Sequence, residues 1–206
     1  MPSVYDLKPA FQGLLRPLVN ALVGAGVTPN HLTLAAALGS IAAGIALTAA
    51  DRNPRLLLVL PAWLFARMAL NAMDGMAARE HGRMTRLGGA LNEIGDVASD
   101  VALYLPIAAL GPGHLWPAVA FALGAVLTEF CGVLGPALRG SRRYDGPMGK
   151  SDRALAIGTL GLVSGLAPPT LAWWPPVLWV AAALTLVTCW NRVAGALREP
   201  PAAAPR

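Results

Sequence analysis

Long apolar segments alternate with short polar turns along almost the entire chain. Six of these segments approach the length of about 20 residues that a helix needs to cross the hydrocarbon core of a bilayer. We expect helices at residues 31–50, 56–78, 87–110, 115–138, 151–166 and 174–197. Glycine and proline mark several ends, as at Gly111-Pro112-Gly113 and Pro168-Pro169. The pattern predicts an all-α integral membrane protein with six transmembrane helices.

The first segment, residues 5–24, has a different pattern. Lys8, Gln12, Arg16 and Asn20 recur between its leucines. It is too polar to cross a bilayer and is typical of an amphipathic helix in the membrane interface, with an ordinary packed helix as the alternative. We expect this interfacial helix at 1–27, a six-helix membrane domain at 28–198 and a disordered tail at 199–206. Thr28 is the predicted N-cap of the first spanning helix.

Composition supports a membrane protein over a soluble one. Only 13% of the residues are charged, whereas soluble domains contain about 25%. The net charge of +5 raises the possibility of nucleic-acid binding, but the arginines lie in short loops and leave no soluble face for such a patch. Cys131 and Cys189 lie inside apolar segments, where a thiol behaves as a small core residue, so we expect neither a disulfide nor a metal there.

Lysine and arginine are distributed unequally between the two ends of the predicted helices. Only Arg52 and Arg55 lie on one side, and positive residues favour cytoplasmic loops. We therefore expect both termini to be cytoplasmic, in a bacterial inner membrane. Aromatic residues typical of the interface occur near both ends of the last helix: Trp173, Trp174, Trp179 and Trp190.

Polar residues gather between 71 and 100, beside two apolar segments. An ionised side chain at the centre of a membrane helix costs roughly 2.5–3.5 kcal/mol, so such residues normally mark function. Spacings of three and four place them on one face of each helix. The two faces carry Asn71 and Asp74 on one helix, and Asn92, Asp96 and Asp100 on the next.

Two such faces would form an oxygen-rich pocket open to the cytosol. Oxygen ligands suit Mg²⁺ or Mn²⁺, which usually complete their coordination shell with substrate phosphates. Arg79, Arg83 and Arg86 in the adjoining turn could bind the same phosphates. The sequence thus predicts a metal-dependent site for a phosphate-bearing substrate.

The same residues resemble a family signature. Asp74-Gly75, Ala78-Arg79, Gly88, Asn92 and Asp96 keep the spacing D-x-x-D-G-x-x-A-R-x8-G-x3-D-x3-D of the CDP-alcohol phosphotransferase (CDP-alcohol phosphatidyltransferase) family. That resemblance implies transfer of a substituted phosphate from a CDP-linked donor, usually CDP-diacylglycerol, to a small alcohol, with release of CMP. It also implies a homodimer in contact with membrane lipids.

The resemblance further implies a role for each matching position. Asp74 would ligate a divalent metal, and Asp96 would ligate it and act as the general base. The nucleotide would lie against the remaining positions: Gly75, Ala78, Arg79 and Gly88.

Two positions depart from the signature, because Asn71 and Asn92 replace its first and third acidic residues. An asparagine carbonyl can ligate a metal but brings no charge. One metal could remain, or another carboxylate could compensate, and Asp100 is the best placed because it continues the face of Asn92 and Asp96. Glu93 and Glu129 are further candidates.

Lys150 and Arg153 form a basic pair at the start of the fifth spanning helix. We expect them to face the acceptor cavity, although anchoring the loop is an equal alternative. Arg67 is expected to form an ion pair inside the membrane domain, and Glu129 is either its partner or part of the cavity wall. The sequence does not identify the acceptor.

Loss of two acidic positions also supports a competing hypothesis. A catalytically silent family member could use the pocket to bind a nucleotide or a lipid headgroup, or could act as a membrane scaffold. A small transporter would explain acids inside the membrane, but it would not explain why glycine, alanine and arginine occupy the signature positions.

Overall fold

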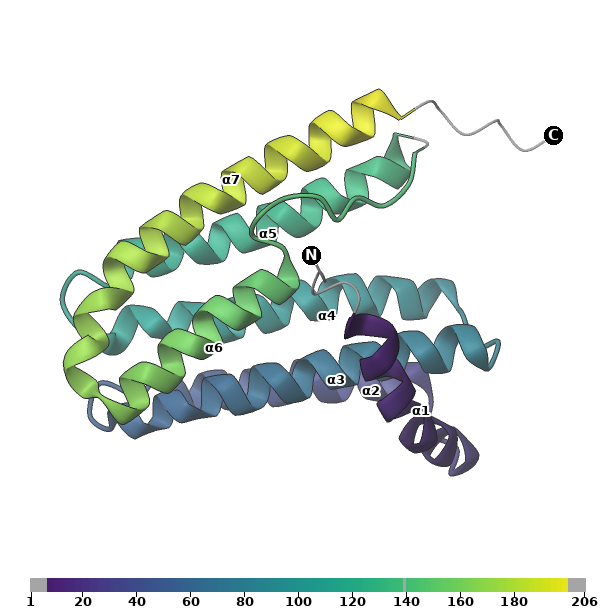
Figure 1. The fold of residues 1–206 in the computed structure, drawn as a ribbon, viewed down its shortest axis with the longest axis horizontal. Coiled ribbons are helices and arrows are strands. Elements are labelled where there is room, and N and C mark those ends of the chain that lie inside the picture. Colours follow the sequence, from purple (N-terminus) through teal and green to yellow (C-terminus); the bar gives the residue numbers. More distant parts are fainter. Residues whose placement is uncertain (1–6, 139, 200–206) are drawn as a thin grey trace.

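The computed structural model of the protein describes residues 7–138 and 140–199. The described residues form helices and connecting turns without any strand, so the predicted all-α class is confirmed (Figure 1). The α-helices are α1 (Leu7–Gly24), α2 (Pro29–Leu47), α3 (Val59–Glu80), α4 (Arg86–Tyr104), α5 (Leu115–Ala137), α6 (Lys150–Leu166) and α7 (Trp174–Arg198). Three 3-10 segments extend or precede them: η2 (Pro54–Leu58), η3 (Leu105–Leu110) and η4 (Pro168–Trp173).

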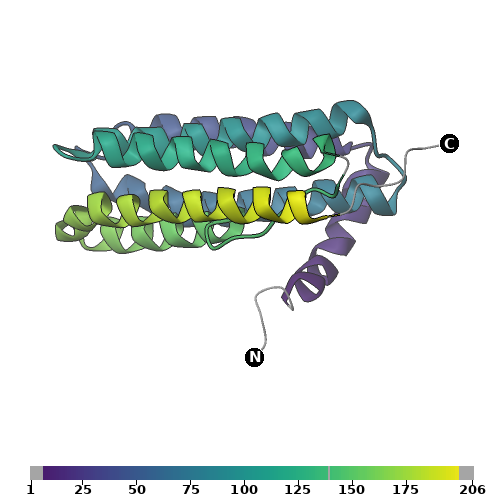
Figure 2. The same cartoon turned by 90° about the horizontal axis from the view of Figure 1, so that it is seen from above.

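The long helices lie side by side in a bundle of two layers. Figure 2 shows α2, α4 and α5 in one layer and α3, α6 and α7 in the other. The layers are held together where α2 packs on α3 and where α5 packs on α7. Helix α1 points away from one end of the bundle, where it contacts α3.

Local signals explain where the helices begin. The Thr28 hydroxyl accepts a hydrogen bond from the His31 amide at 3.3 Å, while His31 Nδ1 accepts one from the Thr28 amide at 3.3 Å. This confirms the predicted N-cap of α2. Thr85 caps α4 in the same way, accepting from the Gly88 amide at 2.9 Å. Each cap satisfies backbone donors that a first turn leaves unpaired.

Glycines allow two pairs of helices to approach closely. A Cβ at Gly44 would overlap the carbonyl oxygen of Ala102, so α2 and α4 are in backbone contact. A Cβ at Gly124 would overlap the hydroxyl of Thr185, which brings α5 against α7. Small residues at helix crossings are typical of membrane bundles, where close packing replaces the hydrophobic effect.

Among residues 7–138 and 140–199, four helices are long and apolar enough to cross a membrane, as expected of an integral membrane protein: α2, α3 with η2, α5, and α7 with η4. Of the other two predicted spans, α4 carries the acidic residues of the polar stretch, and α6 has only 17 residues. The predicted tail falls almost entirely on residues 200–206, outside the described part of the chain.

One aromatic residue differs from its predicted interfacial place. Trp173, Trp179 and Trp190 are exposed, but Trp174 is buried and its indole nitrogen donates to Ser164 at 3.0 Å. Trp174 is therefore part of the core between α6 and α7.

Candidate functional site

The polar faces of α3 and α4 meet through two crosswise hydrogen bonds. The Asn71 amide nitrogen on α3 donates to Asp96 Oδ1 on α4 at 3.1 Å. The Asn92 amide nitrogen on α4 donates to Asp74 Oδ2 on α3 at 3.2 Å. Each asparagine thus contacts the aspartate of the opposite helix, and the four signature positions form one cluster.

Asp74 is buried and has a second partner from α2. The Thr33 hydroxyl donates to Asp74 Oδ2 at 2.9 Å. Thr33 was not among the candidates from the sequence. Thr33 is a single threonine in an apolar helix, and nothing in the local sequence marks it as a site residue. Only its hydrogen bond to Asp74, 41 residues later in the chain, identifies it as part of the site. Asp74 Oδ1 receives no side-chain hydrogen bond from a described residue.

Asp96 is held by cations at both carboxylate oxygens. Arg67 donates to Asp96 Oδ1 at 3.2 Å, and the Lys150 ammonium contacts Asp96 Oδ2. The predicted ion pair of Arg67 is confirmed. The side chain of Lys150 is 31% exposed whereas that of Asp96 is 3% exposed, so the lysine forms the accessible edge of the cluster.

Asp100 does not join the cluster as a compensating ligand. One oxygen accepts from Arg67 at 2.6 Å and the other from Arg153 at 2.8 Å. Both oxygens are thus committed to guanidinium groups in a buried setting. A metal at Asp100 would have to break a buried ion pair, which is strongly unfavourable.

Arg153 lies inside the bundle instead of facing an acceptor cavity. Its side chain is 0% exposed, and it donates to Glu129 at 2.7 Å and Thr128 at 2.7 Å in addition to Asp100. Glu129 pairs with Arg153 and with Arg142 at 3.1 Å, not with Arg67. The basic pair predicted from the sequence is therefore divided: Lys150 reaches the site and Arg153 ties α4, α5 and α6 together.

The positions expected to border the nucleotide lie on the exposed side of the same cluster. A Cβ at Gly75 would lie 3.1 Å from both terminal nitrogens of Arg79, so this guanidinium folds back over the glycine. A Cβ at Gly88 would lie 3.0 Å from Asn30 Oδ1. Ala78 is partly exposed between them. The small residues leave backbone accessible to a ligand near the C-terminal end of α3 and the N-terminal end of α4.

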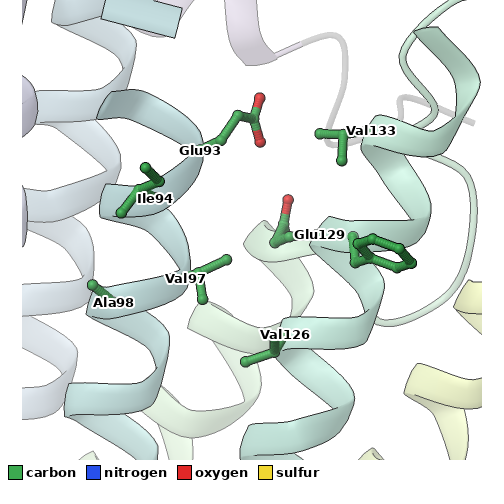
Figure 3. A pocket seen from close by; sticks show the side chains of 8 residues that line it. Glu93, Ile94, Val97, Ala98, Val126, Glu129 and Val133 are labelled. Carbon is green, nitrogen blue, oxygen red and sulfur yellow. The ribbon is translucent and has the colours of Figure 1, made fainter. Parts of the chain in front are cut away.

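A groove runs between α4 and α5 beside the cluster (Figure 3). Its volume is about 370 Å³. The walls are apolar apart from two carboxylates, Glu93 and Glu129, which come from opposite helices. Arg142 bridges them, with 2.7 Å to Glu93 and 3.1 Å to Glu129. Arg142 and Arg153 together thus provide the counterions of these two acids, which make no hydrogen bond to the four signature positions.

The donor set fits one hard cation and does not form an all-carboxylate site. Among residues 7–138 and 140–199, no three histidine, cysteine, aspartate or glutamate side chains lie close enough together to hold a metal ion. Asp74 and the carbonyl ends of Asn71 and Asn92 offer oxygen ligands, as Mg²⁺ and Mn²⁺ require. Such ions commonly complete their shell with water and substrate phosphate.

Known proteins are similar to this chain in sequence. The chain is 48% identical to the inner membrane protein YnbA of Escherichia coli K12 over 191 residues, 92% of this chain and 94% of that one. It is 28% identical to phosphatidylinositol phosphate synthase of Mycobacterium marinum over 201 residues, 89% of this chain and 80% of that one.

Solved structures share the fold. The Mycobacterium tuberculosis phosphatidylinositol phosphate synthase PgsA1 in complex with manganese and citrate superposes with a TM-score of 0.74 at 21% identity, covering 89% of each chain. The same enzyme with CDP-DAG bound gives 0.73 at 22% identity, covering 89% of this chain and 94% of that one. The family model described as CDP-alcohol phosphatidyltransferase matches residues 26–190, a range that contains every residue of the cluster. The chain is therefore a member of the CDP-alcohol phosphatidyltransferase family.

Proposed function

We propose that this protein transfers a phosphatidyl group from CDP-diacylglycerol to the hydroxyl of a small alcohol and releases CMP, in phospholipid biosynthesis. The observation that carries the proposal is the crosswise pairing of Asp74 with Asn92 and of Asp96 with Asn71, 3.1–3.2 Å between donor and acceptor. It brings both remaining signature carboxylates to one place, where a diphosphate and a cation can meet.

The nucleotide end of the donor lies against Gly75, Ala78, Arg79 and Gly88. Glycine and alanine let the ligand approach the backbone of α3 and α4, and the Arg79 guanidinium can bind phosphate oxygens in a fork. The CDP-DAG found in the related M. tuberculosis enzyme supports a CDP-linked lipid as the donor. Membrane lipid and the donor's acyl chains suit the apolar walls of the groove between α4 and α5.

The reaction is a displacement at the phosphorus that carries the diacylglycerol. The acceptor oxygen forms a bond to this phosphorus while the bond to the bridging diphosphate oxygen breaks, and that oxygen leaves with CMP. Asp96 takes the proton of the acceptor hydroxyl, a role that suits a carboxylate held within reach of the attacking group. A divalent cation, Mg²⁺ or Mn²⁺, would neutralise the diphosphate and the charge that develops on CMP. Asp74 would hold it, together with the amide oxygens of Asn71 and Asn92.

Of the two cations predicted to receive the acceptor, Lys150 is the accessible one, and Arg153 positions Asp100 and Glu129 beneath the site. The acceptor is a small alcohol that enters past Lys150.

We further propose that six helices span a bacterial inner membrane, with α4 and α6 as the two additional spans. The charged side chains of α4 and α6 pair inside the bundle, which supports both helices as spans. Asp96, Asp100 and Arg153 are buried and therefore shielded from lipid. Both termini and the site then face the cytosol by the positive-inside tendency. Leu14 and Leu18 on α1 are exposed, as expected of an interfacial helix. The family resemblance supports a homodimer.

One assay tests the function. Purified full-length protein receives CDP-diacylglycerol, Mg²⁺ or Mn²⁺ and a panel of alcohols, and CMP release is measured. We expect turnover that stops on addition of EDTA and in Asp96→Ala. Absence of CMP with every acceptor, alongside intact binding of CDP, would identify a silent nucleotide-binding member of the family instead.

A further inference from the structure

The site has two carboxylates, Asp74 and Asp96, where its four signature positions suggest four. The amides of Asn71 and Asn92 each present hydrogen to a carboxylate, because an aspartate oxygen can only accept. If both positions were acidic, each contact would join two negative charges at about 3 Å, an arrangement that needs a cation between them. The amides remove that need.

Asp96 already has positive charge at both oxygens. Lys150 contacts Oδ2, while Arg67 lies 3.2 Å from Oδ1. A divalent ion bound at Asp96 would lie beside the ammonium, and like charges this close repel strongly in a site of low dielectric constant. Asp74 is different, since its partners are the neutral groups of Thr33 and Asn92. The two aspartates therefore offer unequal places to a cation.

Lys150 also has the reach that a substrate contact needs. It is the first residue of α6, and its side chain is partly exposed while Arg67, the other cation at Asp96, is buried with 4% exposure. Its ammonium can therefore point from Asp96 toward an anion that enters from the cytosolic side. Lysine commonly binds phosphate as a compact point charge.

We propose, resting on the function above, that the site takes a single divalent cation at Asp74 and that the Lys150 ammonium supplies the second positive charge to the phosphate being transferred. Lys150 is then a catalytic residue that contacts the donor, and Asp96 holds it in position. The covalent step is unchanged, because the lysine forms no bond and gives up no proton.

Counting bound Mn²⁺ tests the first half of the proposal without any turnover. Full-length protein in detergent is titrated with Mn²⁺ in the presence of CDP, and free Mn²⁺ is followed by electron paramagnetic resonance. We expect one ion per chain. The triple variant Asn71→Asp, Asn92→Asp, Lys150→Met should bind two. Two ions, or none, on the unaltered chain would overturn the proposal, as would an unchanged count in the triple variant that still binds CDP.

CDP affinity tests the second half. Loss of a charge-assisted hydrogen bond to phosphate reduces affinity roughly 10-fold to 100-fold, so Lys150→Met should weaken CDP binding by that factor and lower kcat, while Lys150→Arg should recover part of both. Arg143→Met is the matched control, since Arg143 lies on the loop that precedes α6 but pairs with Asp145 at 2.8 Å and Glu199 at 3.4 Å. Unchanged CDP affinity in Lys150→Met with a raised acceptor KM would show that the lysine binds the acceptor, and would overturn the proposal. These binding measurements remain informative if no alcohol supports CMP release, an outcome that would reject the proposed function alone.

Discussion

Arg153 Nη2 lies 2.8 Å from Asp100 Oδ2. The two side chains are 0% and 1% exposed, and they are 53 residues apart in the sequence. The same nitrogen lies 2.7 Å from Glu129. One guanidinium therefore neutralises acids from two neighbouring helices, directly beneath the signature cluster. Arg67 connects this buried network to the candidate site, because it donates hydrogen bonds to both Asp100 and Asp96.

Breaking the network should destabilise the bundle. Removing one partner of a buried ion pair typically costs about 3–5 kcal/mol, because the other charge remains buried and uncompensated. We expect Arg153→Met to lower the thermal unfolding temperature of the detergent-solubilised protein markedly. Arg16→Met is the control, since Arg16 pairs with Glu80 at the surface, and exposed pairs contribute little. Equal unfolding temperatures for the two variants would contradict the structural role of Arg153.

Removing the Thr33 hydroxyl should lower the catalytic efficiency. Thr33→Val keeps the shape but removes the donor to Asp74. A hydrogen bond to a charged group contributes about 1.5–3 kcal/mol, so we expect kcat/KM to fall about 10-fold or more. Thr33→Ser retains the hydroxyl and should keep most of the activity. A similar loss in both variants would point to packing of the missing methyl group instead.

Adjacent glycines in α4 offer a matched test of the nucleotide surface. A Cβ at Gly88 would lie 3.0 Å from Asn30 Oδ1 and Thr85 Oγ1, whereas a Cβ at Gly89 would meet nothing within 4 Å. Gly88→Ala should raise the KM for CDP-diacylglycerol by disturbing both neighbours. Gly89→Ala should leave KM unchanged and stabilise the helix by about 0.5–1 kcal/mol. Comparable KM values for the two variants would remove Gly88 from the nucleotide surface.

The crossing of α2 and α4 should not accept a side chain at Gly44. Its Cβ would overlap the Ala102 carbonyl, which belongs to a backbone and cannot rotate away. Overpacking of this kind typically costs about 1–3 kcal/mol, so Gly44→Ala should lower the unfolding temperature. Gly13→Ala in α1 is the control, because its Cβ would have no neighbour within 4 Å. The idea fails if both substitutions leave the unfolding temperature unchanged.

Helix positions were predictable because chemistry visible in the sequence marks their ends. Thr28 caps α2 as expected, and the described helices begin and end within a few residues of the predicted ranges. The 3-10 segments were not predicted, since a proline such as Pro54 or Pro168 marks an end without fixing the turn that precedes the next helix. Apolar periodicity reports on burial along a helix, and it carries little information about connecting segments.

The site was predictable as far as helical spacing reaches. Spacing placed Asn71 and Asp74 on one face, and Asn92 and Asp96 on another, but it could not show that the pairs cross. The buried ion pairs of Arg153 were not predicted, for a related reason. Its partners Asp100 and Glu129 come from two other helices. Only the packing of these helices in the structure shows that both acids form ion pairs with the Arg153 guanidinium.

The residues of the buried network occur in a fixed order along the chain. Arg67 precedes Asp100, and Arg142 follows Glu129 by 13 residues, so one counterion for each acid is already translated when α6 begins. Arg153 then enters with α6 and contacts both acids. The residues of the pairs Arg67–Asp100 and Arg142–Glu129 are therefore translated before the residue that joins the two acids.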